Sequence, residues 1–413
     1  MRLFLSRGAG TPPAPRAAGS ARLLLSSVLG LVVLITAGCG AATPTVAPPP
    51  PASAATATTA APAAASPTVA APTTAATVAP TTAATVAPTT AATVAPTTAA
   101  TVAPTTAATG PTFTNPVLTR DFPDPFVLKA GDLYYAYATN GAGKNIQRAT
   151  SPDLVHWSVQ GDAMPALASW AQIGGNFVWA PEVIAIGGKY VMYYTARDKT
   201  ADKQCVGVAV SDTPDGRFKD SNDHPLVCQV DEGGTIDPDP FQDGDKLYLY
   251  FKNDGNCCGR TTYIYVQELS PDGLQLVGQP TQLVSNDEYW EGHVVEAPTM
   301  FKHDGKYYLF YSANDYGGAD YAVGYATCQA PTGPCQDAPE NPILKSRLDP
   351  PLVIGPGHQA LLQVGDQTWI VYHVWQAVAG GRGDSRLMWI DRVNWSDGKP
   401  QVQGPTTGPQ PMP

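Results

Sequence analysis

Four carboxylates and one histidine recur at similar places along the chain, each about five to eight residues before a tight turn. They are Asp124, Glu182, Asp237, Glu296 and His358, and a proline lies close to each of the four carboxylates. A single carboxylate beside a proline would be an ordinary feature of a turn. Five similar placements favour a shared site. Packed carboxylates resist ionising together, so one of them keeps a proton beside ionised neighbours. Hydrolysis of a glycosidic bond needs this combination of acid and base.

Other side chains near these residues are candidates for contact with a sugar. Trp179 and Trp290 lie three and six residues before two of the carboxylates and would offer flat platforms, although such rings belong to a core as often. His293 lies near Glu296 in the sequence and would line the pocket. Arg386 precedes an apolar strand and would bind a substrate hydroxyl or a carboxylate, or else form a structural salt bridge.

A fivefold repeat indicates the elements that position these residues. A turn of Gly or Asp-Gly is followed each time by alternating aromatic and apolar residues, and the copies start 56, 57, 60 and 61 residues apart. The copies begin at Gly131, Gly187, Gly244, Asp304 and Gly365. Each is a β-hairpin signal, and helical periodicity is nearly absent.

Five all-β units of about 60 residues predict a five-bladed β-propeller. A β-sandwich is the structural alternative, but it would not repeat five times at this period. In a propeller the innermost strands face one axis. We therefore expect the four carboxylates and the histidine to occupy equivalent positions around a single funnel.

The motifs that carry these residues, taken in order and one per blade, resemble glycoside hydrolase family 43 from about residue 117 to about residue 400. They are Pro-Asp124-Pro-Phe, Trp179-Ala-Pro-Glu182, Ile236-Asp237-Pro, Trp290-Glu-Gly-His-Val-Val-Glu296-Ala-Pro and Gly355-Pro-Gly-His358. The resemblance implies a five-bladed propeller that cleaves α-L-arabinofuranosyl or β-D-xylosyl linkages of plant cell-wall polysaccharides with inversion.

The resemblance also implies a role for each matching residue. Asp124 would be the general base, Glu296 the general acid, and Asp237 the third carboxylate, which tunes and orients the acid. Inversion would place Asp124 and Glu296 about 6.5–9.5 Å apart, leaving room for a water molecule. His358 would lie near a calcium or sodium ion, held through water, and no cofactor is required. Glu182 is expected to contact substrate or line the channel.

Several neighbouring residues leave the register open. Asp121 lies three residues before Asp124 and Asp239 two residues after Asp237, while Glu291 is a rival of Glu296. We favour the residues at the shared proline-flanked positions. Gln359 stands where arabinan-cleaving members commonly have Asn, which weakens the inference of a metal site.

Two other functions compete with this one. A fructan or sucrose hydrolase on the related propeller would use an Asp nucleophile in an Asn-Asp-Pro-Asn-Gly context, which the Phe122-Pro-Asp-Pro-Phe sequence does not match. A non-catalytic carbohydrate-binding propeller is the other alternative. The presence of all three expected carboxylates disfavours it.

The N-terminal part of the chain divides into a leader and a stretch, residues 41–112, whose Ala, Thr, Pro and Val composition cannot build a core. An apolar run of about 15 residues, from residue 23 to residue 37, ends at Thr36-Ala37-Gly38-Cys39, which resembles a bacterial lipobox. We expect a signal peptide over 1–38, lipidation at Cys39 and a cell-surface location, with simple secretion as the alternative. Residues 39–112, rich in Ala, Thr and Pro, would be a disordered stalk, followed by the propeller over 113–405 and a tail over 406–413.

The charge of the chain bears on its partners. The formal net charge is −10, from 25 basic and 35 acidic residues, which argues against nucleic acid or an anionic membrane face as partner. The expected partner is a polysaccharide or oligosaccharide, with membrane contact only through the lipid anchor and the protein as a monomer.

Six cysteines remain after Cys39, and an even number in an exported domain suggests disulfides. Cys328 with Cys335 is the first expected pair and Cys205 with Cys228 the second. The adjacent Cys257 and Cys258 would form either a vicinal bridge or two separate ones. No zinc-type cysteine cluster is present.

Overall fold

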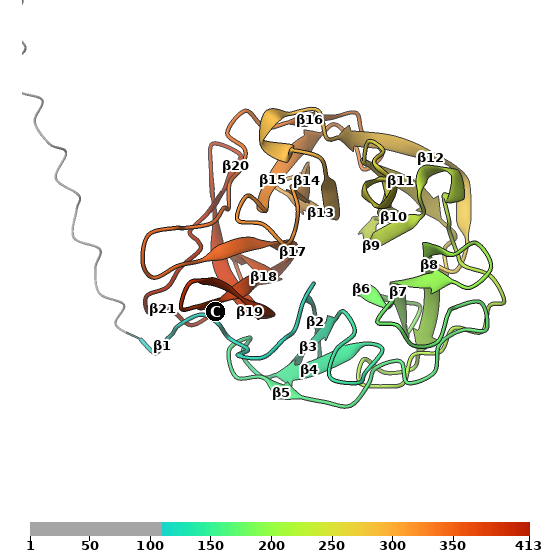
Figure 1. Ribbon diagram of the computed structural model, residues 1–413, viewed down its shortest axis with the longest axis horizontal. Helices are drawn as coiled ribbons and strands as arrows, with labels where there is room; N and C mark the ends of the chain where they lie inside the picture. Colours follow the sequence, from blue (N-terminus) through green and yellow to red (C-terminus); the bar gives the residue numbers. More distant parts are fainter. Residues whose placement is uncertain (1–109) are drawn as a thin grey trace, which may run out of the picture. The chain divides into compact units, whose positions relative to one another are not determined.

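A computed structural model describes residues 110–413. These residues form five sheets of three or four antiparallel strands, arranged as blades around a central axis (Figure 1). The prediction of an all-β, five-bladed propeller is confirmed. The predicted signal peptide, the lipidation site at Cys39 and the stalk up to residue 109 lie outside the described residues.

In each blade the strands follow one another outward from the axis in chain order. Four blades have four strands, and the second blade has three. The first blade contains β2 (Phe126–Ala130), β3 (Leu133–Ala138), β4 (Gln147–Ser151) and β5 (Ser158–Val159). The second contains β6 (Trp179–Ile186), β7 (Lys189–Asp198) and β8 (Lys203–Ser211). The third contains β9 (Thr235–Asp243), β10 (Lys246–Asn253), β11 (Tyr263–Leu269) and β12 (Leu276–Ser285).

The last two blades complete the ring. The fourth contains β13 (Val295–His303), β14 (Lys306–Ala313), β15 (Ala322–Cys328) and β16 (Cys335–Asp337). The fifth contains β17 (Ile354–Val364), β18 (Gln367–Val378), β19 (Gly381–Ser396) and β20 (Lys399–Val402). Short 3₁₀ turns lie at Val230–Glu232, Gly255–Cys258 and Tyr289–Glu291.

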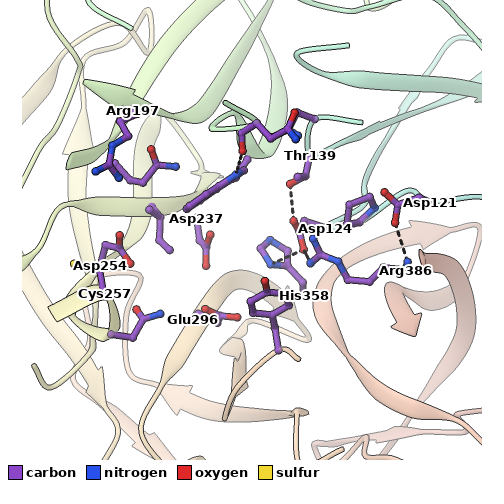
Figure 2. Close-up of a pocket in the computed structure, with 18 residues that line it drawn as sticks. Asp121, Asp124, Thr139, Arg197, Asp237, Asp254, Cys257, Glu296, His358 and Arg386 are labelled. Atoms are coloured by element: carbon purple, nitrogen blue, oxygen red, sulfur yellow. Dashed lines mark hydrogen bonds and ion pairs between the residues drawn. The ribbon is translucent and has the colours of Figure 1, made fainter. Parts of the chain in front are cut away.

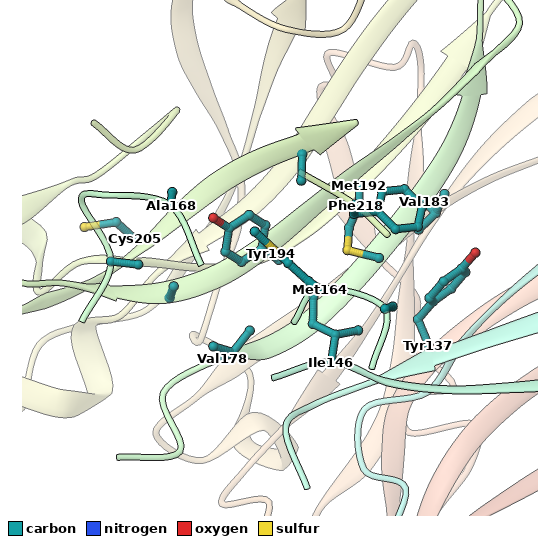
Figure 3. Close-up of a cluster of buried hydrophobic side chains, with 14 of the residues drawn as sticks. Tyr137, Ile146, Met164, Ala168, Val178, Val183, Met192, Tyr194, Cys205 and Phe218 are labelled. Carbon is teal, nitrogen blue, oxygen red and sulfur yellow. The ribbon is translucent and has the colours of Figure 1, made fainter. Parts of the chain in front are cut away.

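The five sequence repeats all form the hairpin between the first and second strand of a blade. In the first blade, Ala130 pairs with Leu133 across the turn, and the other four blades have the same two-residue connection. The alternating aromatic residues then fill the spaces between blades. Five apolar clusters lie there, and Figure 3 shows the one between the first two blades, where Tyr137, Met192 and Tyr194 are fully buried.

The two ends of the described chain are tied to the ring. Strand β1 (Thr112–Phe113) pairs with β21 (Gln410–Pro411), which lies in the segment expected as a tail. The segment before β2 also donates backbone hydrogen bonds to the fifth blade, from Phe122 to the carbonyl of Arg386 at 2.8 Å. These contacts fix the position of Asp124 next to the last blade.

Three disulfides are present in residues 110–413. Cys205–Cys228 and Cys328–Cys335 are the two pairs expected from the sequence, and Cys257–Cys258 forms a vicinal bridge rather than two separate ones. In the same part of the chain, no helix has the length and apolar character needed to cross a membrane.

A residue with positive φ, here called the bulge, marks the entrance to each innermost strand. At this entrance the φ angle of one non-glycine residue is positive, between 43° and 55°: Asp124, Ala180, Asp237, Ala297 and His358 in the five blades. In four blades the pairing of the first two strands also shifts register there. Such backbone costs about 1–3 kcal/mol per residue and persists where its surroundings hold it. A bulge at a strand end changes the direction in which its side chains point.

The bulge corrects one expectation from the sequence. Asp124, Asp237 and His358 occupy the positive-φ position, but Glu182 lies two residues after it and Glu296 one residue before it. The expected equivalence of all five residues is therefore wrong for the two glutamates. One residue of shift beside a bulge is enough to send a side chain to a different part of the channel.

Candidate active site

A pocket of about 550 Å³ opens at the axis of the propeller and is lined by residues from all five blades. It brings together Asp124, Asp237, Glu296, His358 and Arg386, as predicted (Figure 2). Figure 2 shows Asp124 and Arg386 on one side of the pocket and Asp237 and Glu296 on the other. The remaining lining residues are Asp121, Pro123, Thr139, Asn140, Asn176, Trp179, Arg197, Gln204, Ile236, Asp254, Asn256, Cys257 and Tyr316.

Cations and donors surround Asp124. Nη1 of Arg386 lies 2.7 Å from its Oδ1, and Nδ1 of His358 lies 3.4 Å from the same oxygen. The hydroxyl of Thr139 donates to Oδ2. Burial alone would raise the pKa of Asp124, but the charges of Arg386 and His358 outweigh it and hold the pKa well below its usual range. Asp124 is thus ionised at neutral pH, as a base must be.

Glu296 and Asp237 lie together on the opposite side. Glu296 accepts hydrogen bonds from the Tyr321 hydroxyl at 2.8 Å and from Nζ of Lys252 at 3.4 Å. Oδ2 of Asp237 accepts the backbone N–H of Ala297, the residue after Glu296, at 3.0 Å. Burial, together with the nearby charge of Glu296, raises the pKa of Asp237 to about 6. Asp237 therefore keeps its proton to a higher pH than a free aspartic acid does.

The Tyr321 contact depends on a glycine in the fifth blade. A Cβ atom at Gly357 would collide with the Tyr321 ring, so only glycine lets this ring lie beneath Glu296. The ring also stacks on His373, with centroids 5.8 Å apart. Burial lowers the pKa of His373 to about 4, so this imidazole is neutral, and its Nδ1 accepts the backbone N–H of Asp124.

Glu182 does not line the pocket. It is buried beside Asp239, and these two residues occupy corresponding places in β6 and β9, opposite Tyr193 and Tyr250. Burial and the charge of Asp239 raise the pKa of Glu182 well above its ordinary value, and burial raises that of Asp239 to about 6. This pair is a buried acid couple that the sequence did not reveal, and Asp239 is its second member.

We expect the acid couple to make the stability of the fold depend on pH. A raised folded-state pKa gives stability that is fully present below the unfolded value of about 4 and is lost as pH rises through about 6. We expect the urea midpoint of the wild type to fall between pH 5 and pH 8. The Glu182→Gln variant should lose less, because its amide donates to Asp239 at any pH. Parallel pH dependence in the two proteins would contradict the assignment.

The structure separates the remaining predicted residues into two groups. Trp179 lines the pocket, and its Nε1 donates to the carbonyl of Asn176 at 2.9 Å. Trp290 lies outside this pocket and packs on Tyr311 with ring centroids 5.6 Å apart. His293 lines a neighbouring pocket of about 580 Å³, which shares Asn256, Glu296 and Tyr316 with the central one.

Several residues of the site were missed from the sequence. Lys252, Tyr316 and Tyr321 carry no motif, although each follows a hairpin repeat on its second strand or the loop after it. Tyr316 is 49% exposed, and the guanidinium of Arg386 lies 5.0 Å from its ring centroid. A signal for Lys252 existed, because this lysine directly follows the run of apolar and aromatic residues from Leu247 to Phe251.

The surroundings of His358 give no direct ligand set for a metal. Within residues 110–413, no three His, Cys, Asp or Glu side chains are grouped so as to hold an ion. The His358 ring instead faces the carboxylate of Asp124. Calcium or sodium held through water at His358 stays a prediction.

Comparison with known proteins identifies the family to which this pocket and fold are similar. The model for glycosyl hydrolases family 43 matches residues 113–400. A crystal structure of a thermostable family-43 glycoside hydrolase is similar, with a TM-score of 0.67 and 36% identity over 73% of this chain and 99% of that one. An endo-1,4-β-xylanase structure from Bacteroides thetaiotaomicron gives a TM-score of 0.61 at 30% identity over 71% and 97%.

The relatives with similar sequences are enzymes named for different sugar substrates. A β-D-galactofuranosidase of Aspergillus niger is 29% identical over 68% of this chain and 82% of its own length. An extracellular endo-α-(1→5)-L-arabinanase of Thermotoga petrophila is 30% identical over 56% and 54%. A β-xylosidase of Bacillus subtilis is 27% identical over 71% and 57%. The chain thus spans little more than half the length of the last two.

A match over most of the described residues, a shared propeller and a pocket with opposed carboxylates agree with one another. The chain belongs to glycosyl hydrolases family 43 and is a glycoside hydrolase.

Proposed function

We propose that this enzyme cleaves α-L-arabinofuranosyl or β-D-xylosyl linkages of plant cell-wall polysaccharides with inversion of configuration. The observation that carries the proposal is the contrast between the two sides of the pocket. Arg386 and His358 hold the pKa of Asp124 well below its usual range, whereas burial raises the pKa of Asp237, on the side of the pocket where Glu296 lies, to about 6. Two carboxyl environments pushed apart in this way assign a base and an acid. Names of relatives that include an arabinanase and a β-xylosidase support the substrate class.

The proposed reaction is a single displacement. Asp124 accepts a proton from a water molecule as that water attacks the anomeric carbon, and Glu296 gives its proton to the leaving oxygen. Asp237 orients the acid by accepting the backbone N–H of Ala297, the residue after Glu296. The products are a free sugar of inverted anomeric configuration and a shortened or debranched chain.

The position of Glu296 also assigns a direction to the substrate. Glu296 lines both the central pocket and the neighbouring one that contains His293, whereas Asp124 lines the central pocket. Because the acid protonates the oxygen that departs, the leaving group lies on the side of the second pocket. Tyr316 and Asn256, which line both pockets, would contact the sugars on either side of the broken bond.

The test is hydrolysis of a panel of aryl α-L-arabinofuranoside, aryl β-D-xyloside, aryl β-D-galactofuranoside and debranched arabinan. We expect release from an arabinofuranoside or xyloside, with the first-formed anomer inverted when followed by NMR. A retained anomer would exclude the single displacement. Activity on the galactofuranoside alone would replace the proposed sugar, and release from no member of the panel would count against the proposed substrate class.

We also propose that the enzyme works outside the cytoplasm, as a lipoprotein anchored at Cys39. The support is the lipobox-like sequence and the three disulfides of the described domain, since disulfides persist in oxidising compartments. Metabolic labelling with a fatty acid, lost in Cys39→Ser, would test the anchor. Labelling unchanged in that variant would contradict it.

A further inference from the structure

The second strand of each blade, or the residue just after it, carries a polar side chain close to the bulge of the next blade. At four of the five junctions this side chain accepts the backbone N–H of that residue. The pairs are Thr139 with Ala180, Thr195 with Asp237, Ser312 with His358, and His373 with Asp124, at distances of 2.8–3.3 Å. Hydroxyl oxygens and an unprotonated imidazole nitrogen can serve as acceptors. This ring of hydrogen bonds holds the bulges in place.

Lys252 breaks the pattern between the third and fourth blades. It occupies the place in β10 that Thr195 occupies in β7, at the last strand pair before the bulge. An ammonium group cannot accept a hydrogen bond, so the N–H of Ala297 goes to the carboxylate of Asp237 instead. The Lys252 ammonium lies 3.4 Å from Oε2 of Glu296.

The propeller does not need a lysine at this place. Lys252 is 0% exposed, and a buried ammonium is costly unless it is partnered. A threonine would satisfy the Ala297 N–H as Thr195 satisfies its own partner, without burying a charge. The lysine therefore serves the carboxyls of the site, and the loss of the hydroxyl directs the Asp237 carboxylate to the backbone beside Glu296.

A second contact holds the lysine in place. Its Nζ donates to Oδ1 of Asn256 at 2.8 Å, and Asn256 belongs to the 3₁₀ turn Gly255–Cys258. The next two residues of this turn, Cys257 and Cys258, are joined by the vicinal disulfide. Asn256 and Cys257 both line the central pocket, and Figure 2 shows Cys257 on the side where Asp237 and Glu296 lie. A covalent ring through adjacent residues restricts the conformations of this exposed turn.

We propose that Lys252 is a positioning residue for the general acid, and that the Cys257–Cys258 disulfide acts through it by fixing Asn256. The inference rests on the proposed function, because it assigns Glu296 the role of acid. The proposed contacts run from the disulfide at the pocket rim through Asn256 and Lys252 to Glu296, the general acid.

The test uses Lys252→Thr, which restores the hydroxyl that the other blades use and is expected to fold, as circular dichroism and thermal melting would check. We expect kcat on a natural oligosaccharide to fall about tenfold or more with little change in KM, because the acid loses its fixed partner. On a dinitrophenyl glycoside, whose leaving group needs little protonation, the loss should be less than about threefold. Loss of the ammonium should also move the basic limb of the kcat/KM profile to higher pH, because a positive charge nearby favours the ionised carboxyls.

The disulfide is tested with Cys257→Ala/Cys258→Ala in both backgrounds. We expect a lower kcat on the oligosaccharide when Lys252 is present and no further change in the Lys252→Thr background. The matched control is Cys328→Ala/Cys335→Ala, which removes a disulfide between β15 and β16 of the fourth blade and should leave the ratio of the two substrates unchanged.

The outcomes separate the possible failures. An unchanged basic limb and equal losses on both substrates in Lys252→Thr would overturn the role of Lys252. Equal effects of the disulfide variant in both backgrounds would overturn the link to Asn256. A wild-type enzyme that is inactive on the whole panel would instead contradict the proposed function.

Discussion

Replacing Glu296 by glutamine should lower kcat on natural linkages by about 10³-fold, within the usual 10²–10⁴-fold contribution of a general acid. The amide keeps the size of the side chain and still accepts the Tyr321 hydroxyl, but it has no proton to give. On a dinitrophenyl glycoside the loss should be less than about tenfold, because that leaving group departs without protonation. The measurement is the ratio of kcat values on the two substrates.

The matched control for this variant is Glu291→Gln. Glu291 is the rival acid in the same sequence motif, and the structure shows it buried against the Tyr311 hydroxyl rather than in the central pocket. The same chemical change there should leave the ratio of the two substrates at its wild-type value. A selective loss on natural linkages in Glu291→Gln, with none in Glu296→Gln, would reverse the assignment of the acid.

The fold was predictable because its signal is repeated. Each hairpin alone is a weak indication, but five turn-and-strand units at nearly constant spacing are compatible with few architectures. The same repetition predicted that Asp124, Asp237 and Glu296 meet in one pocket, although they come from three different blades. The cyclic arrangement of the blades predicts which distant residues meet at the axis, which local secondary-structure propensity cannot predict.

The register of the site was less predictable, and the cause is the bulge. A positive φ is uncommon at any non-glycine residue, even at Asp and His, where it is enriched, so residue type alone does not place it there. The sequence therefore could not show that Glu182 lies past the bulge, beside Asp239, or that Glu296 lies before it. Contacts that depend on a neighbouring blade, such as that of Lys252 with Glu296, were equally hidden.

Tyr316 illustrates a third limit. It lies in the connection between β14 and β15, where no periodic pattern exists, and its ring packs on Trp375 of the fifth blade with centroids 6.3 Å apart. Trp290 illustrates the reverse case. It has the right residue type beside the right motif, yet its ring packs on Tyr311 outside the central pocket. Distance along the chain was a poor guide to distance from the axis.

Replacing Asp124 by asparagine should abolish activity on both kinds of substrate, with a loss of about 10³-fold or more. A good leaving group does not help, because the attacking water still lacks a base. The amide also leaves the Arg386 guanidinium and the His358 ring without the anion they surround. Single-turnover rates on the oligosaccharide and on the dinitrophenyl glycoside would measure this, and a loss confined to the oligosaccharide would contradict the role of base.

The neighbouring Asp121 provides the comparison that decides the register. Its carboxylate accepts the backbone N–H of Arg386 at 2.9 Å, a contact that asparagine can keep. Asp121→Asn should therefore lose much less activity than Asp124→Asn.

The pH profile gives an independent criterion, because the base titrates on the acidic side. With the pKa of Asp124 held well below its usual range, the acidic limb of the wild type should lie below about pH 4. An acidic limb near pH 6 would mean that the essential base is a different, less well stabilised carboxylate.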